Sequence, residues 1–192
     1  MKISFHNSIE EISRESWDAL IGDLNYPFLK HDFLKTLEIT NCVGTNTGWI
    51  PIHITIERDK ELIAAMPLYL KSHSQGEFVF DHAWANAFYQ HGLDYYPKLV
   101  SSIPHTPASG PRFLLKDGEE KSVLFEKIKE GVKMISSKNN ISSWHILFPE
   151  KDEINFYENS QLSIRKNAQF IWFNKNYKNF SEISAASGVV LD

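Results

Sequence analysis

The feature that most constrains the fold is a pair of adjacent strand-like segments near the middle of the chain. In the segment 49–57, isoleucines occupy every second position from Ile50 to Ile56, a period typical of a half-buried strand. A polar turn at 58–60 follows, and the segment 61–70 is then almost continuously apolar, as in a buried strand. We therefore predict a β-hairpin inside a layered α/β domain.

Helical and extended patterns alternate along the rest of the chain. Ser8 and Asp81 stand at predicted helix starts as N-caps, and the segment 118–138 carries the clearest apolar stripe of any helix. This order predicts an α/β fold, a mixed sheet flanked by helices on both faces. The other expected elements are strands over 2–6, 77–80, 113–115, 141–148 and 164–173, and helices over 8–21, 32–39, 81–91, 150–159 and 180–187.

Composition narrows the classes of function. The chain has 192 residues, enough for one domain, and its formal charge of −4 argues against a general DNA-binding protein, which needs an excess of Lys and Arg. A single cysteine, Cys42, excludes an internal disulfide and suits a reducing compartment. No apolar stretch has the length of a signal peptide or of a transmembrane helix, so we expect a cytoplasmic protein.

The densest polar run lies directly after the buried strand of the hairpin. It reads Lys71-Ser72-His73-Ser74-Gln75-Gly76-Glu77, and Asp81-His82 follows four residues later. Loops between a strand and a helix are where α/β folds usually place binding groups, and these residue types can transfer protons or orient an anionic substrate. The alternative is a solvated loop in which Asp81 only caps a helix.

Other kinds of site are less well supported. His73, His82, His91 and Glu77 are possible metal ligands, but their spacing matches no common zinc pattern, so no metal site is predicted. Neither Cys42 nor the serines of the polar run lie in a nucleophile motif, and no glycine-rich phosphate-binding loop is present.

A proline-rich segment offers a possible groove. It begins with Tyr95-Tyr96-Pro97-Lys98 and ends with Pro107-Ala108-Ser109-Gly110-Pro111-Arg112. Arg112 can bind a phosphate or a carboxylate bidentately. The alternative is a rigid edge with both tyrosines packed on the core. Of the tryptophans, only Trp84 lies close enough to the polar run to suggest a site.

The run 67–85, Pro-Leu-Tyr-Leu-Lys-Ser-His-Ser-Gln-Gly-Glu-Phe-Val-Phe-Asp-His-Ala-Trp-Ala, resembles the FemAB-like proteins of the GNAT (Gcn5-related N-acetyltransferase) superfamily. The resemblance extends over residues 15 to about 182. It is carried also by Pro27-Phe28-Leu29, Gly48-Trp49, Tyr95 to Leu99, Pro104 to Pro107, Gly110-Pro111-Arg112, Trp144 to Pro149 and Gln169 to Trp172.

The resemblance implies a GNAT-like fold and transfer of an acyl or aminoacyl group to an amine, with peptidoglycan precursor metabolism as the expected setting. Glu77, His73 or His82 would then be the base, and Lys71 or Arg112 would hold an anionic group. The remaining expected substrate contacts are Ser72, Gln75, Asp81, Trp84, Tyr96 and Lys98. The donor stays open between acyl-CoA and aminoacyl-tRNA. The alternatives are a module that binds cell-wall precursors without turnover and an inactive fragment of a two-domain transferase.

Two departures from the family pattern matter. The acetyl-CoA loop of ordinary GNAT enzymes, Q/R-x-x-G-x-G/A, is absent, which disfavours coenzyme A as the donor. The last residues, 184–192, are small and nearly uncharged. We expect a GNAT-like domain over 1–183 and an atypical tail over 184–192 that reflects a truncation or frameshift.

Overall fold

The predicted hairpin is present, but its two ends belong to different sheets. The computed structural model describes residues 1–23, 26–166, 173 and 175–187. Strands β3 (His53–Arg58) and β4 (Glu61–Met66) pair antiparallel around the turn. Beyond a break at Ile52, whose backbone N–H donates to the carbonyl of Leu68 over 2.9 Å, the same two arms pair again in a second sheet. A single long hairpin therefore links the two sheets.

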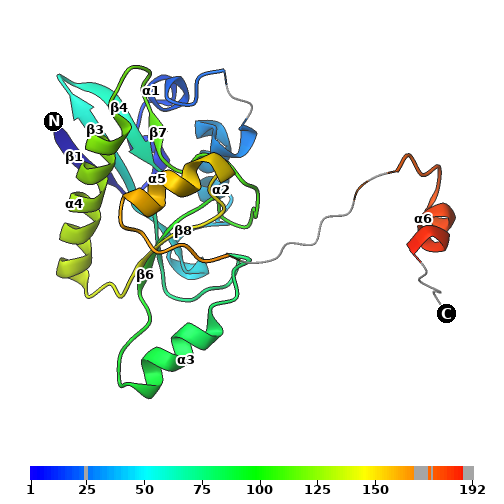
Figure 1. Ribbon diagram of the computed structural model, residues 1–192. Coiled ribbons are helices and arrows are strands. Elements are labelled where there is room, and N and C mark those ends of the chain that lie inside the picture. The colour runs from blue at the N-terminus through cyan, green and yellow to red at the C-terminus, as the bar shows by residue number, and fades with distance from the viewer. Residues whose placement is uncertain (24–25, 167–172, 174, 188–192) are drawn as a thin grey trace. The chain divides into compact units, whose positions relative to one another are not determined.

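The described residues form two four-stranded sheets (Figure 1). The first has the order β1-β3-β4-β7 and is antiparallel, whereas the second has the order β2-β5-β6-β8, with β6 and β8 parallel. The strands not yet given are β1 (Lys2–His6), β2 (Trp49–Pro51), β5 (Tyr69–Lys71), β6 (Lys98–Ser101), β7 (Leu114–Leu115) and β8 (Trp144–Ile146). The helices are α1 (Arg14–Ala19), α2 (His31–Ile39), α3 (His82–Gln90), α4 (Lys121–Asn139), α5 (Ile154–Asn159) and α6 (Phe180–Ser187).

Helices cover both faces of the first sheet, as predicted. Helix α4 packs on the face that carries Ile3 and Ile54, and Gly131 lets it approach closely: a Cβ there would lie 2.8 Å from Ile54 Cδ1. The opposite face carries Ala65, which belongs to a buried cluster with Trp17 of α1 and Leu34 of α2. Side chains that alternate along β3 and β4 therefore pack against two separate helical layers, one on each face of the sheet.

Several predicted boundaries were wrong for local reasons. The helix expected over 8–21 is divided, because Ser13 accepts a hydrogen bond from the N–H of Ser16 and starts a new helix after the 3₁₀ turn Ile9–Glu11. The segment 77–80 forms no strand. The strand predicted over 141–148 is limited to β8, and most of the strand predicted over 164–173 lies outside the described residues.

The chain divides into two compact units, Met1–Leu162 and Ser163–Asp192. In the second unit, α6 confirms the helix predicted over 180–187, and Asn179 Oδ1 accepts a hydrogen bond from the N–H of Glu182 at its start. The expected boundary between a domain ending at residue 183 and a tail over 184–192 remains a prediction.

Gly131→Leu tests the contact between α4 and the first sheet. The added side chain would overlap Ile54, and overpacking of this kind costs about 1–3 kcal/mol. We expect the urea midpoint to fall accordingly, while Lys133→Leu, at an exposed position of the same helix, changes it little. Equal midpoints for the two variants would contradict the packing.

Candidate functional site

Two buried lysines are register partners at the end of the two central strands of the second sheet. Lys71 on β5 and Lys98 on β6 are direct cross-strand partners, and Trp49 on β2 is the partner of Lys71 on its other side. All three residues are 0% exposed. Like charges directly opposite each other destabilise a strand pair, and a buried ammonium group requires polar partners.

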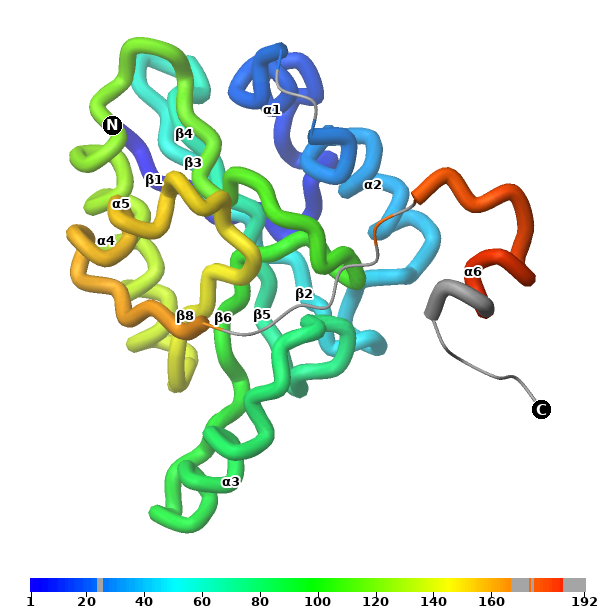
Figure 2. The backbone as a smooth tube through the Cα atoms, turned by 45° about the vertical axis from the view of Figure 1, so that its right-hand side comes forward, coloured from blue at the N-terminus to red at the C-terminus, as the bar shows by residue number. Residues whose placement is uncertain are grey.

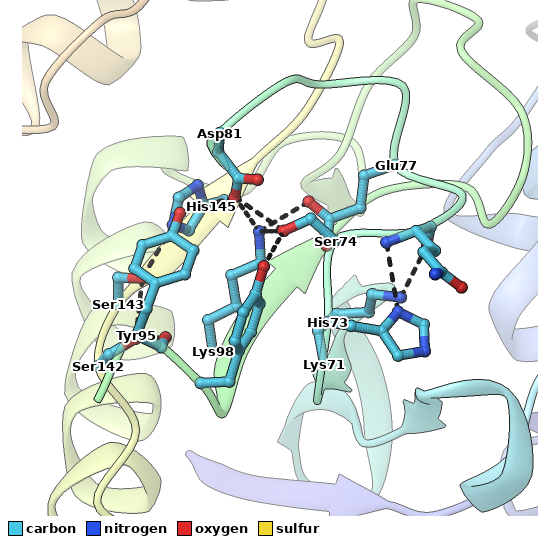
Figure 3. Close-up of polar contacts among 12 residues, drawn as sticks. Lys71, His73, Ser74, Glu77, Asp81, Tyr95, Lys98, Ser142, Ser143 and His145 are labelled. Atoms are coloured by element: carbon cyan, nitrogen blue, oxygen red, sulfur yellow. Dashed lines mark hydrogen bonds and ion pairs between the residues drawn. The ribbon is translucent and has the colours of Figure 1, made fainter. Parts of the chain in front are cut away.

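The connection between β5 and α3, residues 72–81, supplies those partners and is called the site loop below. Lys98 Nζ lies 2.8 Å from Glu77 Oε2, 2.5 Å from Asp81 Oδ2 and 2.8 Å from Ser74 Oγ. Figure 3 shows the lysine side chain rising from β6 toward these three groups. Figure 2 shows α3 beside the ends of β5 and β6. The loop therefore folds back over the strands that carry the lysines.

Asp81 is held as a permanent anion. Its Oδ2 atom accepts hydrogen bonds from Tyr95 OH over 2.7 Å and from Ser74 Oγ over 2.9 Å, in addition to that from Lys98. Burial alone would raise the pKa of this carboxyl, but the hydrogen bonds outweigh burial and lower the pKa to about 2. Asp81 does precede α3, as predicted, but its side chain makes no capping hydrogen bond there.

Glu77 binds the same lysine, but its pKa is shifted in the opposite direction to that of Asp81. Burial raises the pKa of the Glu77 carboxyl, and the ion pair with Lys98 only partly opposes that effect. The Oε1 atom of Glu77 is buried and has no hydrogen-bond partner in the part of the chain that the structure describes, and the same is true of Asp81 Oδ1. Two carboxylates whose pKa values are driven apart are the usual arrangement of a proton acceptor beside a fixed charge.

Lys71 has a different environment from Lys98. Its Nζ atom donates to the carbonyl of Gln75 over 3.1 Å and lies 3.8 Å from the centre of the Trp49 ring. Burial lowers the pKa of Lys71 to about 8, against the attraction of Glu77. No carboxylate of the described residues is within hydrogen-bonding distance of this ammonium group.

His73 is tied into the backbone around the site. Its Nδ1 atom accepts a hydrogen bond from the N–H of Gln75 over 3.2 Å, and the ring packs on the turn at Gly48, where a Cβ would lie 2.3 Å from Nε2. Burial, followed by the charge of Lys71, lowers the pKa of His73. The neutral ring therefore connects the site loop to the turn before β2.

The other predicted site residues lie in varied positions. Tyr96 joins the network through its hydroxyl, 2.8 Å from Ser74 Oγ, and Gln75 contributes its carbonyl. Ser72, His82 and Trp84 are exposed. Arg112 is 1% exposed and donates to the carbonyls of Ala108, Gly110, Pro111 and Leu147. Its guanidinium group holds backbone together, and burial lowers its pKa to about 10.

Sequence reasoning missed two members of the network. Ser74 lies within the polar run but was considered only as a nucleophile, and Tyr95 was interpreted as part of a groove or of the core. Burial and the neighbouring Asp81 raise the pKa of Tyr95, so it stays a hydrogen-bond donor. We call Lys98, Glu77, Asp81, Ser74 and Tyr95 the Lys98 cluster.

The described residues contain no group of three or more His, Cys, Asp or Glu side chains placed to hold a metal ion. Of the helices in the same ranges, none combines the length and the apolar character needed to cross a bilayer.

Comparisons with known proteins agree on family and fold. Residues 8–186 match the sequence profile of the FemAB-like family, described as peptidoglycan biosynthesis/recognition. No curated protein matches the sequence.

Solved acetyltransferases share the fold. An aminoglycoside 6'-N-acetyltransferase from Acinetobacter haemolyticus has a TM-score of 0.51 at 9% identity, over 93% of this chain and 100% of its own. A ribosomal-protein-alanine N-acetyltransferase from Brucella melitensis has a TM-score of 0.53 at 9% identity, over 90% of this chain and 100% of its own. An aminoglycoside N-acetyltransferase in complex with CoA has a TM-score of 0.52 at 10% identity, over 92% of this chain and 95% of its own. The mixed α/β architecture is therefore the GNAT fold.

Lys98→Met tests the electrostatic role of the Lys98 cluster. The substitution leaves Glu77 and Asp81 buried without their cation, and breaking a buried pair in this way costs about 3–5 kcal/mol. Lys116→Met, which removes the partner of Glu61 in a surface ion pair, should cost less than about 1 kcal/mol. Urea unfolding at pH 7 measures both, and similar losses would contradict the assignment.

Proposed function

Because the chain belongs to the FemAB-like family, we propose that it is an N-acyltransferase domain that transfers an acyl or aminoacyl group to an amine of a peptidoglycan precursor. The family description supports the substrate class, and the GNAT fold supports the type of reaction. Cys42 is a free, exposed thiol, which suits the reducing cytoplasm where we place the reaction.

The observation that carries the proposal is the pair of buried carboxylates, Glu77 and Asp81, that bind one lysine. An amine attacks a carbonyl only as the free base, so the site needs a group that accepts its proton. Glu77 has a raised pKa and a buried oxygen without a hydrogen-bond partner among the described residues, and Asp81 forms an ion pair that holds the Lys98 side chain in place. We assign Glu77 as the base and Lys98 and Asp81 as positioning residues.

Other candidates for the base fit less well. The Nδ1 atom of His73 already accepts an amide proton, so a neutral ring carries its own proton on Nε2 and has no free lone pair for an amine. His82 is exposed at the start of α3. Lys71, a buried cation without a bonded carboxylate, is suited to stabilise the negative charge that develops on the attacked carbonyl oxygen.

The start of a helix can bind phosphate groups. In this chain the start of α4 does not suit the phosphates of coenzyme A, which one structural relative binds. Helix α4 follows β7, but Glu119 and Glu120 precede its first residue. Acidic side chains stabilise the positive end of a helix dipole and repel phosphate there. We therefore derive no step through coenzyme A, and aminoacyl-tRNA remains the other donor to test.

Turnover with a peptidoglycan-precursor amine tests the proposal, using aminoacyl-tRNA and acyl-CoA as alternative donors. Loss of a general base typically lowers the rate by about 10²–10⁴-fold. We therefore expect Glu77→Gln to lower the turnover rate by a factor within that range. Glu130→Gln, a surface carboxylate paired with Lys127 on α4, should keep the wild-type rate.

The enzymatic assignment fails if the wild-type chain turns over with neither donor, or if Glu77→Gln is as active as wild type. Precursor binding without turnover would instead identify a recognition module.

A further inference from the structure

The start of strand β8 places a histidine on the same sheet face as the lysines of the site. In the parallel register of β8 with β6, His145 is the partner of Val100. Because side chains alternate along a strand, His145 shares a face with Val100 and therefore with Lys98, two residues earlier. Trp144 lies on the other face, where its ring contacts that of Phe125 on α4.

A hydrogen bond joins this histidine to a serine. Ser143 Oγ lies 2.8 Å from His145 Nε2, so a proton on either atom can pass to the other. Both residues are half-buried, whereas Lys98 on the same face is 0% exposed. The pair is therefore more accessible to a bound substrate than the lysine is.

Aromatic rings hold the histidine next to the Lys98 cluster. The centre of the His145 ring lies 6.2 Å from that of Tyr95, edge to face, and 6.5 Å from that of Trp84 in the first turn of α3. The hydroxyl of Tyr95 donates to Asp81, which forms an ion pair with Lys98. The titratable groups on this side of the ring are therefore Tyr95 and, beyond it, that ion pair.

The proposed base and the serine–histidine pair lie on different sides of one side chain. Figure 3 shows Glu77 on one side of Lys98, and Ser143 with His145 on the other. Acyl transfer to an amine moves two protons, because the amine loses one as it attacks and the leaving atom gains one as it departs. The arrangement provides a proton acceptor and a separate proton donor around the same lysine.

We propose that Ser143 is a catalytic residue that protonates the leaving atom of the acyl donor, and that His145 is a positioning residue that resupplies its proton. The inference rests on the proposed function, because it assigns the second proton of the same transfer. It adds a proton donor that the proposed function does not contain.

The step balances in bonds and protons. The amine nitrogen bonds to the acyl carbon and gives one proton to Glu77, while the bond from that carbon to the leaving oxygen or sulfur breaks and its electron pair stays on the leaving atom. That atom takes the hydroxyl proton of Ser143, and the Nε2 proton of the imidazolium form of His145 passes to Ser143 Oγ. Exchange with water then returns a proton to His145 and removes one from Glu77.

The leaving atom decides how much the pair contributes. A thiol of the cysteine type has a pKa of about 8.5, so a thiolate departs near neutral pH with little need of a proton. An alkoxide is a far stronger base, and its departure depends on protonation. The pair should therefore contribute more with an oxygen ester than with a thioester.

The pH dependence of kcat tests the proposal, measured with the whole chain and each donor that it turns over. For wild type we expect a bell-shaped profile, in which kcat rises as Glu77 loses its proton and falls as His145 loses its own. Ser143→Ala and His145→Gln should remove the falling limb with either donor, and should also lower kcat about 10²-fold with an oxygen ester. Ser143→Thr keeps the hydroxyl group and should retain both the rate and the limb.

Two variants serve as matched controls. Ser137→Ala changes a serine on α4 that donates to the carbonyl of Lys133, and His91→Gln changes an exposed histidine at the end of α3. Both should keep the wild-type profile. If the pair had only a structural role, its variants would lower kcat at every pH and leave the shape of the profile unchanged, and that result would overturn the proposal.

The outcomes separate this inference from the proposed function. If Ser143→Ala keeps the wild-type kcat and the falling limb while Glu77→Gln is impaired, only this inference is rejected. If Glu77→Gln is as active as wild type while the limb still depends on Ser143, only the assignment of the base is rejected. A wild-type chain that turns over neither donor would overturn both. Should His145→Gln fail to fold, the comparison of Ser143→Ala with Ser143→Thr decides alone.

Discussion

The arrangement around the site depends on the ammonium group of Lys98, which is buried at the start of the central strand β6. An unpaired charge there would cost several kcal/mol, a large fraction of the about 5–15 kcal/mol that holds a domain folded. The cost is avoided because the site loop brings Glu77, Asp81 and Ser74 to the same nitrogen. Lys98 is therefore one of the groups that hold residues 72–81 and the start of α3 against the second sheet.

The two lysines differ in a way that separates their roles. Lys98 is surrounded by oxygen atoms of side chains, whereas Lys71 lies between an aromatic ring and a carbonyl. The first environment holds the Lys98 ammonium group in place through side-chain oxygen atoms. In the second, no carboxylate of the described residues is bonded to the Lys71 ammonium group.

Much of the fold could be predicted because it follows from local patterns. The alternation along 49–57 and the apolar stripe of 118–138 correspond to β3 and α4, which pack together through Gly131. The sequence also pointed to the polar run over residues 71–82 as a candidate site. The role of Lys98 was harder to predict, since it depends on the register of β5 against β6, two strands separated by 26 residues of chain.

Local rules were wrong where a long-range contact competed with them. Asp81 has the sequence position of a helix cap, but its carboxylate binds Lys98 and Tyr95, because a buried ammonium group attracts it more strongly than a backbone N–H does. Arg112 was expected to face a substrate, and four carbonyl groups instead take its donors. In both cases the partner of the charged group could not be read from neighbouring residues.

The central claim is that two buried carboxylates on one lysine behave differently, because burial raises the pKa of Glu77 whereas hydrogen bonds from Lys98, Tyr95 and Ser74 lower that of Asp81. Carboxyl ¹³C NMR titration of the whole chain measures this directly, with Glu77→Gln and Asp81→Asn used to assign the two signals. The account predicts that Asp81 titrates near pH 2 and that Glu77 titrates above its usual value of 4.5. Titration of both carboxyls at their ordinary values would contradict it.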